Sequence, residues 1–288
     1  MKLPRRKFLH LAAGAAALPA LSRIARAQAY PTRPITIVVG YAAGGPTDTR
    51  ARIVAQYMKA SLGQSVVVEN ITGASGSIGT ARAARAAPDG YTLSSGDWGT
   101  HVVNGAVYTL QYDLLSDFEP IALLSSTPLL VITKSAVPAT DLKELVAWLK
   151  ANNDKASYGT SGPGSPSHVS GLFLQKMTGM QFQFVPYRGG SLVLQDLIAG
   201  QIDLTFGAAS TVAPAVRDGK IKAYAVTSNA RSTAAPEIPT VDEAGLPGLY
   251  VSLWGGLWAP KGTSKAVIGK LNAAVVEALS DPTARQRV

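Results

Sequence analysis

Short runs of β-branched and apolar residues alternate with helical patterns along most of the chain. Four of the five residues 35–39 are both apolar and β-branched, as in a buried strand. The segment that follows carries apolar side chains at a helical spacing, Ala51, Val54 and Met58 among them. Later strand-like segments are 65–69, 91–95, 156–159, 181–185, 202–206 and 221–227, and later helical segments are 77–87, 142–150, 167–177, 191–199, 211–217 and 264–279. This order predicts an α/β fold with mostly parallel sheets flanked by helices.

One apolar run is longer than an ordinary strand. Residues 120–133 could pass from one lobe to another, and residues 228–248, rich in Pro, Ala and Thr, are typical of a connector that returns to the first lobe. Two such crossings predict a hinge between two lobes, each with its own sheet. We expect lobe 1 to comprise residues 28–126 and 228–288, and lobe 2 to comprise residues 127–227.

The N-terminus has the pattern of an export signal. Four basic residues among the first seven precede the apolar run 8–21, and Ala25-Arg26-Ala27 has the A-x-A form of a cleavage site. The pair Arg5-Arg6 predicts the twin-arginine route, and the Sec route is the alternative. The run is too short, and too rich in Ala and Gly, for a membrane anchor. We therefore expect an exported protein whose signal, residues 1–27, is removed near Ala27.

Charge and composition exclude several classes of function. The net charge is +9, but six basic residues and no acidic residue lie in 1–27, so the mature chain carries +3. No basic run with interleaved aromatic residues is present, which argues against nucleic-acid binding. The chain has no cysteine, and His101 and His168 are too far apart in sequence for a local metal motif. We expect neither a metal nor a cofactor.

The first candidate site is the turn between the strand at 35–39 and the helix that follows it. Gly44 and Gly45 allow close backbone approach, and Pro46 suits a first helical position. The unpaired N–H groups at such a helix start form a socket for a small anion, and an ordinary connection without a ligand is the alternative. The spacing resembles a phosphate loop, but Pro46 stands where the lysine must be. A carboxylate needs less neutralising charge than a nucleotide.

Residues 158–168 have the same organisation: a strand, small flexible residues and a helix start. Ser161 and Ser165 could donate hydroxyl hydrogen bonds to a ligand or simply cap the helix. His168 beside serines suggests a serine hydrolase, but Pro163 stands where the nucleophile-elbow pattern G-x-S-x-G requires its final glycine. We expect His168 to donate a hydrogen bond or to pack.

Asp97 follows a predicted strand, at the carboxyl edge where ligands of open α/β sheets bind. It could accept a hydrogen bond from a ligand amine, or it could cap the next short helix while Trp98 packs. Tyr41, Trp98, Tyr187 and Trp254 could line the cleft, although aromatic residues more often belong to a core.

Several ordered motifs resemble the substrate-binding proteins of tripartite tricarboxylate transporters, also called the Bug family. The resemblance covers nearly the whole mature length. The matching motifs are residues 43–48 (AGGPTD), 88–93 (PDGYTL), 162–168 (GPGSPSH), 185–189 (VPYRG), 196–203 (DLIAGQID) and 239–245 (PTVDEAG).

This resemblance implies a two-lobed, type II-like periplasmic binding protein that closes on a small organic anion and presents it to membrane permease subunits, without catalysis. It implies that main-chain N–H groups and ordered waters hold one carboxylate between the two turns. We expect the protein to act as a monomer. The predicted ligand-binding residues are Tyr41, Ala43, Gly44, Gly45, Thr47, Asp48, Asp97, Ser161, Gly164, Ser165, His168 and Tyr187.

The sequence departs from the family pattern at three points. Gly40-Tyr41 replaces Pro-Phe, Asn104-Gly105 replaces Asn-Pro, and the chain stops at Val288 before the usual terminal helical segment, so we expect a truncated first lobe. The residues leave the identity of the carboxylate open. Two other functions also stay open: an exported α/β enzyme of hydrolase type acting on small acids, and a ligand sensor for a membrane receptor kinase.

Overall fold

The computed structural model describes residues 30–287, and the predicted export signal at residues 1–27 lies outside them. The chain divides into two compact units, Met1–Thr32 and Arg33–Val288, and every element below belongs to the second. Among the described residues, no helix combines the length and the apolar character that crossing a bilayer requires.

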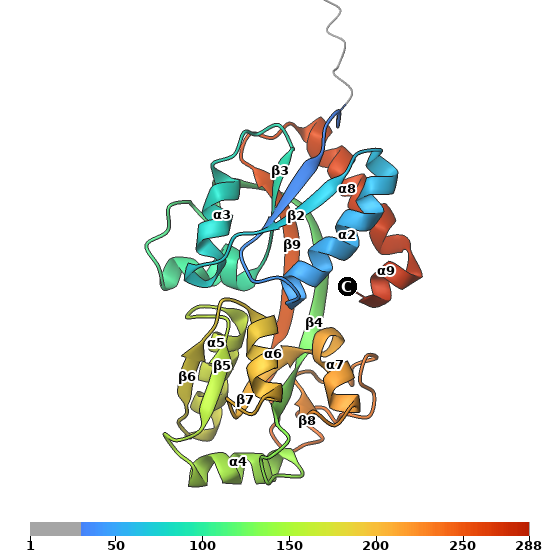
Figure 1. Cartoon of the computed structure of the whole chain (residues 1–288). Coiled ribbons are helices and arrows are strands. Elements are labelled where there is room, and N and C mark those ends of the chain that lie inside the picture. The colour runs from blue at the N-terminus through green and yellow to red at the C-terminus, as the bar shows by residue number, and fades with distance from the viewer. Residues whose placement is uncertain (1–29, 288) are drawn as a thin grey trace, which may run out of the picture. The chain divides into compact units, whose positions relative to one another are not determined.

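Three parallel strands form one end of the sheet (Figure 1). The middle strand, β1 (Ile35–Val39), pairs in parallel with both β2 (Val66–Asn70) and β3 (Thr92–Asp97). Helices α2 (Pro46–Leu62) and α3 (Ser77–Ala84) connect these strands, as the crossovers between parallel neighbours require. The elements predicted for this part of the chain are confirmed to within a few residues at their ends. Three short helical turns accompany them: η2 (Ala74–Gly76), η3 (Gly99–Val103) and η4 (Asn104–Ala106).

Two long strands join the halves of this unit. The N-terminal part of β4 (Phe118–Lys134) pairs with β9 (Ser252–Pro260), and its C-terminal part pairs with β7 (Leu204–Ala208) and β8 (Ile221–Val226). All of these pairs are antiparallel, as is the pair between β9 and β3. Figure 1 shows β4 and β9 running from the upper to the lower half. The long apolar run therefore pairs with strands of both halves, and it joins the two predicted sheets into one.

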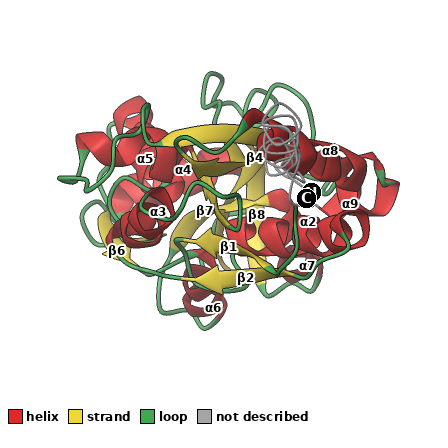
Figure 2. Ribbon diagram, turned by 90° about the horizontal axis from the view of Figure 1, so that it is seen from above, coloured by secondary structure: helices red, strands yellow, loops and turns green. Residues whose placement is uncertain are grey.

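The second half is built around another parallel group, in which β5 pairs with both β6 and β7. The strand order is β2-β1-β3-β9-β4-β7-β5-β6, with β8 paired to β4. Predicted parallel pairing therefore holds at both ends of the sheet, and the joining strands add antiparallel pairs because they run between the halves in opposite directions. The remaining elements are β5 (Ser157–Thr160), β6 (Gln183–Pro186), α4 (Leu142–Ala151), α5 (Pro166–Thr178), α6 (Gly190–Ile198), α7 (Ala209–Arg217), α8 (Lys265–Ser280) and α9 (Pro282–Arg287). Figure 2 shows the strands in the middle with helices on both sides.

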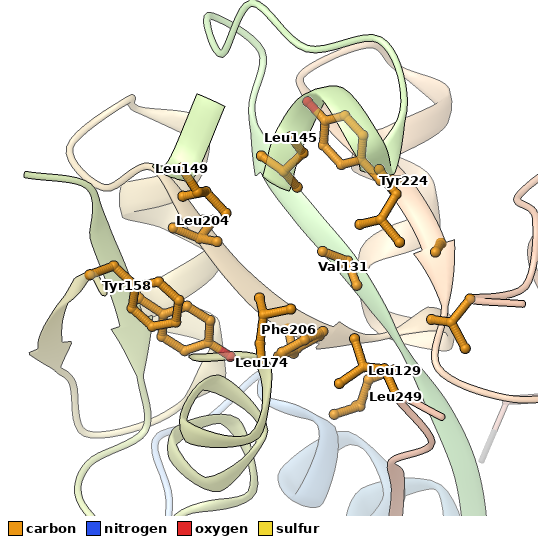
Figure 3. Packing of buried hydrophobic residues seen from close by; sticks show 14 of the residues in the cluster. Leu129, Val131, Leu145, Leu149, Tyr158, Leu174, Leu204, Phe206, Tyr224 and Leu249 are labelled. Carbon is orange, nitrogen blue, oxygen red and sulfur yellow. The ribbon is translucent and has the colours of Figure 1, made fainter. Parts of the chain in front are cut away.

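The core of the lower half packs helices α4 and α5 against the sheet (Figure 3). Leu145, Tyr158 and Leu204 are fully buried in it. Val241 lies within the predicted connector and Leu249 directly follows it, and both are buried in the same cluster. We therefore propose that the chain returns to the first lobe along β9, after this segment. The predicted lobe boundaries otherwise stay predictions.

Candidate functional site

A cavity of about 70 Å³ lies between the two halves of this unit. Its walls include five of the predicted ligand-binding residues: Tyr41, Gly45, Thr47, Asp97 and Ser161. Four of these come from the upper half and Ser161 comes from the lower half, so the fold brings both predicted turns to one cavity. Apolar side chains from the lower half complete the walls, among them Leu129, Val193 and Phe206.

Of the helices that begin at this cavity, three have no side-chain cap. Their N-cap residues are Gly45 for α2, Gly189 for α6 and Ala208 for α7. Thr47, Gly190 and Thr211 of the first turns line the cavity. The N–H groups of a first helical turn have no partner inside the helix, and the helix dipole places positive charge there. The geometry thus concentrates hydrogen-bond donors for an anion.

Three other helices are capped by a side chain, whereas α3 is not. Asp141, Ser165 and Ser264 accept hydrogen bonds from first-turn N–H groups of α4, α5 and α8. Side-chain capping also occurs at the cavity itself, because Pro166 and Ser167 at the start of the capped helix α5 line it. Small residues stand at the three cap positions around the cavity, and this leaves room for a ligand close to the backbone.

The first turn is fixed from behind by Asp48. Its carboxylate accepts hydrogen bonds from the N–H of Gly44 at 2.8 Å, from Nε of Arg52 at 2.9 Å and from Nδ2 of Asn70 at 2.8 Å. Burial raises the pKa of Asp48, but the hydrogen bonds lower it by more than burial raises it. The pKa of Asp48 therefore lies below its usual value. Gly44 has a φ of 78°, which favours glycine. Neither residue lines the cavity, because their polar groups bond to each other.

Residues of the first turn also contact the lower half. The N–H of Ala42 donates to the oxygen of Arg188 at 3.0 Å, and the hydroxyl of Ser191 donates to the oxygen of Ala43 at 2.8 Å. Ala43 therefore lies against the start of α6 and not on the cavity wall. These bonds join the halves next to the cavity.

The second turn is held by its own side chains. Ser165 is fully buried and caps α5, accepting a bond from the N–H of His168 at 3.3 Å. Nδ1 of His168 accepts a bond from the N–H of Gly164 at 3.2 Å, and burial lowers the pKa of this half-buried imidazole. The N–H of Ser161 donates to the hydroxyl of Ser167 at 3.0 Å. Gly164, Ser165 and His168 thus shape the turn and do not line the cavity, whereas Ser161 and Ser167 do.

Among the aromatic residues considered for the cleft, Tyr41 lies on the wall of this cavity. Tyr187 lies away from it, with its hydroxyl donating to Asp196 at 2.7 Å, and burial together with Asp196 raises the pKa of Tyr187 to about 12. The indole N–H of Trp98 donates to the oxygen of Ser252 at 3.0 Å. Trp98 and Trp254 do not line the cavity.

Asp97 both caps a helical turn and faces the cavity. Its Oδ1 accepts bonds from the N–H groups of Gly99 at 2.9 Å and Thr100 at 3.2 Å. The hydroxyls of Tyr41 and Thr47 donate to the same carboxylate at 3.3 and 3.4 Å. Burial raises the pKa of Asp97, and this effect outweighs the nearby Arg50 and the hydrogen bonds. The expectation that Asp97 caps the next helical turn is confirmed, and its contact with a ligand stays a prediction.

Sequence reasoning missed the starts of α6 and α7. The signal was present at Gly189-Gly190, directly before the predicted helix at 191–199, and at the small residues Ala208 and Ala209 before the helix at 211–217. No comparable pattern in the sequence identified the apolar residues of the cavity wall, such as Leu129, Val193 and Phe206. Within residues 30–287, no group of three or more His, Asp or Glu side chains comes together as a metal site.

Comparison with known proteins places the chain in a family. Residues 50–288 match the tripartite tricarboxylate transporter family receptor. The protein BugT of Bordetella pertussis is 35% identical over 255 residues, which cover 88% of this chain and 78% of BugT.

Two solved structures are similar over most of the chain. MatC from Rhodopseudomonas palustris, solved with bound malate, is 40% identical with a TM-score of 0.86, covering 90% of this chain and 88% of that one. Rpa4515 of R. palustris, solved with adipate, is 34% identical with a TM-score of 0.85, covering 88% of this chain and 86% of that one. The chain therefore belongs to the tripartite tricarboxylate transporter receptor family, whose two-lobed periplasmic binding protein fold it shares.

Proposed function

We propose that this protein is a periplasmic receptor that captures a small carboxylate between its two lobes and delivers it to a tripartite tricarboxylate-type membrane transporter. The observation that carries the proposal is the convergence of three uncapped helix N-termini on one cavity. A carboxylate accepts several hydrogen bonds at once, and charge-assisted bonds of this kind are the strong ones.

The cavity also suits the rest of such a ligand. Leu129, Val193 and Phe206 offer an apolar surface to a short carbon chain. The family relation supports the same ligand class, because malate and adipate, the acids bound by the two similar structures, are both small carboxylates.

The predicted site residues take two kinds of role in this proposal. Tyr41, Gly45, Thr47, Asp97 and Ser161 would contact the ligand, because they line the cavity. The others do not line this cavity, and they would position the two turns: Ala43, Gly44, Asp48, Gly164, Ser165, His168 and Tyr187.

We propose that the lobes close on the ligand by a hinge motion along β4 and β9. Two hydrogen bonds join the halves, one at each turn. Ser191 donates to Ala43 of the first turn at 2.8 Å, and Ser75 donates to Pro163 of the second turn at 2.7 Å. Such bonds would form on closure and exclude water from the cavity. Small-angle scattering should report a smaller radius of gyration with ligand than without it, and an unchanged radius would contradict closure.

We propose binding without turnover. The ring of His168 accepts a bond from a backbone N–H, and the ring of His101 bonds to Ser94 and Thr100. Within residues 30–287, neither imidazole therefore forms a hydrogen bond with a serine that lines the cavity. Incubating the protein with malate or adipate should therefore leave the acid unchanged by mass spectrometry. A released product would favour the enzyme alternative instead.

The export signal at residues 1–27, its cleavage near Ala27 and a monomeric state in solution are further parts of the proposal. The family relation supports the periplasm as the compartment and permease subunits as the partners.

A thermal-shift measurement on residues 28–288 tests the binding function. At about 100 times the dissociation constant, a bound acid should stabilise the protein by roughly 2.7 kcal/mol. For a chain of this size, this corresponds to about 5 to 10 °C in Tm. Malate, adipate and other small acids are the ligands, and an amine of matched length is the control. Absence of a shift with every carboxylate would overturn the proposed function.

A further inference from the structure

A second cavity, of about 270 Å³, adjoins the first one. The two share Pro46 from the start of α2 and Thr211 from the start of α7. The second cavity is the more polar in its side chains, because Arg50, Thr127 and Ser210 line it. A ligand held at the helix N-termini can thus extend from one cavity into the next.

Arg50 is the charged residue of this second cavity, and it is only 3% exposed. Nη1 donates to the hydroxyl of Ser125 at 3.1 Å, and Nη2 donates to the oxygen of Gly96 at 3.4 Å. Nε is buried and has no hydrogen-bond partner. Among residues 30–287, no carboxylate lies within ion-pair distance of this guanidinium.

The fold keeps room for this side chain. A Cβ atom at Gly255 of β9 would collide with Nη2 of Arg50. The guanidinium therefore lies directly on the backbone of one of the two joining strands, between β9 and the Ser125 hydroxyl of β4. Any side chain larger than hydrogen at residue 255 would displace it.

Burying a guanidinium without a counter-ion is unfavourable, because the charge loses its hydration and gains only neutral acceptors. Asp97 is close enough to act electrostatically on Arg50, but its oxygens accept bonds from Gly99, Thr100, Tyr41 and Thr47. Burial lowers the pKa of Arg50 and Asp97 opposes this shift. The guanidinium thus has no carboxylate in ion-pair contact within residues 30–287, and it lines a polar cavity that an anion from outside the chain can enter.

We propose that Arg50 recognises a second carboxylate of the ligand, so that this receptor selects short-chain dicarboxylates over monocarboxylates. The inference rests on the proposed function: one carboxylate lies at the N-termini of α2, α6 and α7, and the other lies in the second cavity against Arg50. Thr127 and Ser210 supply hydroxyl donors to the same group. Arg50 is thus a specificity-determining residue, and the backbone turns alone do not set the preference.

Isothermal titration of residues 28–288 with succinate and with its monomethyl ester tests this inference, and adipate with its monomethyl ester forms a second, longer pair. Each ester keeps one carboxylate and replaces the other by a neutral group of similar shape. The wild-type protein should bind at least one diacid about 10- to 100-fold more tightly than its monoester, the range expected for a charge-assisted hydrogen bond. This comparison needs no variant, so it does not depend on the folding of a mutant.

Two variants locate the preference. Arg50→Gln should bring the ratio of the two dissociation constants close to one, and Arg50→Lys should retain part of it because the charge stays. The control, Arg217→Gln at the end of α7, should leave the ratio as in the wild type. Circular dichroism of each variant checks that it is folded.

The outcomes separate the inference from the proposed function. Equal binding of each diacid and its monoester by the wild-type protein would overturn the role of Arg50 and leave the carboxylate receptor intact. A folded Arg50→Gln variant that loses affinity for both compounds by the same factor would show a structural role for Arg50 and would also overturn the inference. If the wild-type protein bound no acid at all, the proposed function itself would fail.

Discussion

The hydroxyl of Ser191 donates a hydrogen bond to the main-chain oxygen of Ala43 at 2.8 Å, and it thereby ties the start of α6 to the turn before α2. Two helices that supply uncapped N-termini to the cavity are held together by this bond. Neither Ser191 nor Ala43 lines the cavity, so the contact offers a way to change closure without changing the cavity wall.

Ser191→Ala should weaken ligand binding modestly. Loss of one neutral hydrogen bond at an exposed position costs about 0.5 to 1.5 kcal/mol, or roughly two- to tenfold in the dissociation constant. Titration calorimetry measures the change. Ser280→Ala is the matched control, because its hydroxyl also donates to a main-chain oxygen at 2.8 Å, within α8. An affinity loss of the same size in both variants would contradict a role in closure.

Gly45→Leu should abolish the thermal shift produced by a carboxylate, whereas Gly45→Ala should keep most of it. Gly45 has a φ of −79°, so a side chain causes no backbone strain. A Cβ atom there would lie 3.7 Å from the nitrogens of both Gly190 and Ser191, which is ordinary contact. A leucine side chain extends further, toward the place that we assign to the carboxylate. A full ligand-induced shift in Gly45→Leu would remove the first turn from the site.

Asp48→Asn should lower both stability and affinity. The carboxylate bonds to Gly44, Arg52 and Asn70, and the loss of charge-assisted bonds costs about 1.5 to 3 kcal/mol. Because the pKa of Asp48 is lowered in the folded protein, the wild-type advantage is present above pH 3.8 and is lost as the pH falls through the folded-state pKa. Urea unfolding at several pH values measures the stability.

The matched control for Asp48 is Asp203→Asn in the lower half. Asp203 also has a lowered pKa, and it bonds to Lys134 and Ser157, both at 2.7 Å. This variant should lose stability without losing affinity for the acid, because Asp203 does not line the cavity. If both variants lost affinity equally, Asp48 would have no particular role in positioning the first turn.

His101 should make the protein less stable in acid. Its ring stacks on Trp258 with centroids 3.8 Å apart, and burial lowers its pKa from 6.5 to about 3. The unfolded chain therefore binds a proton below about pH 6.5 that the folded protein does not bind, and stability falls as the pH drops toward 3. Between pH 7 and 4.5 this one group should cost roughly 2 to 3 kcal/mol.

The pH dependence of urea unfolding tests this prediction when wild type and His101→Gln are compared, because titrating groups common to both proteins cancel in the difference. His168→Gln, which removes a half-buried histidine, should keep most of the slope. Nuclear magnetic resonance gives a second measurement: the His101 ring signal should not titrate down to about pH 4. An ordinary titration near pH 6.5 in the folded protein would contradict the argument.

Much of the fold follows from local patterns in the sequence. The β-branched run 35–39 forms β1, the helical pattern after Pro46 forms α2, and the predicted helix at 142–150 forms α4 behind Asp141, a residue type favoured as an N-cap. The long run 120–133 forms most of β4 because an apolar stretch of this length can pair with strands of both halves in succession. Each of these features depends on neighbours in sequence, so periodicity and capping rules are sufficient to predict them.

The sequence by itself thus determined the elements, the two anion-facing turns and the family, because these are recorded in short ordered motifs. The tertiary structure alone decided which groups meet. It turned Asp48 and His168 toward their own turns, brought the starts of α6 and α7 to the cavity, and left the guanidinium of Arg50 buried without a carboxylate. These outcomes depend on how β4 and β9 cross between the halves, and a strand crossing sets distances between residues that no local pattern encodes.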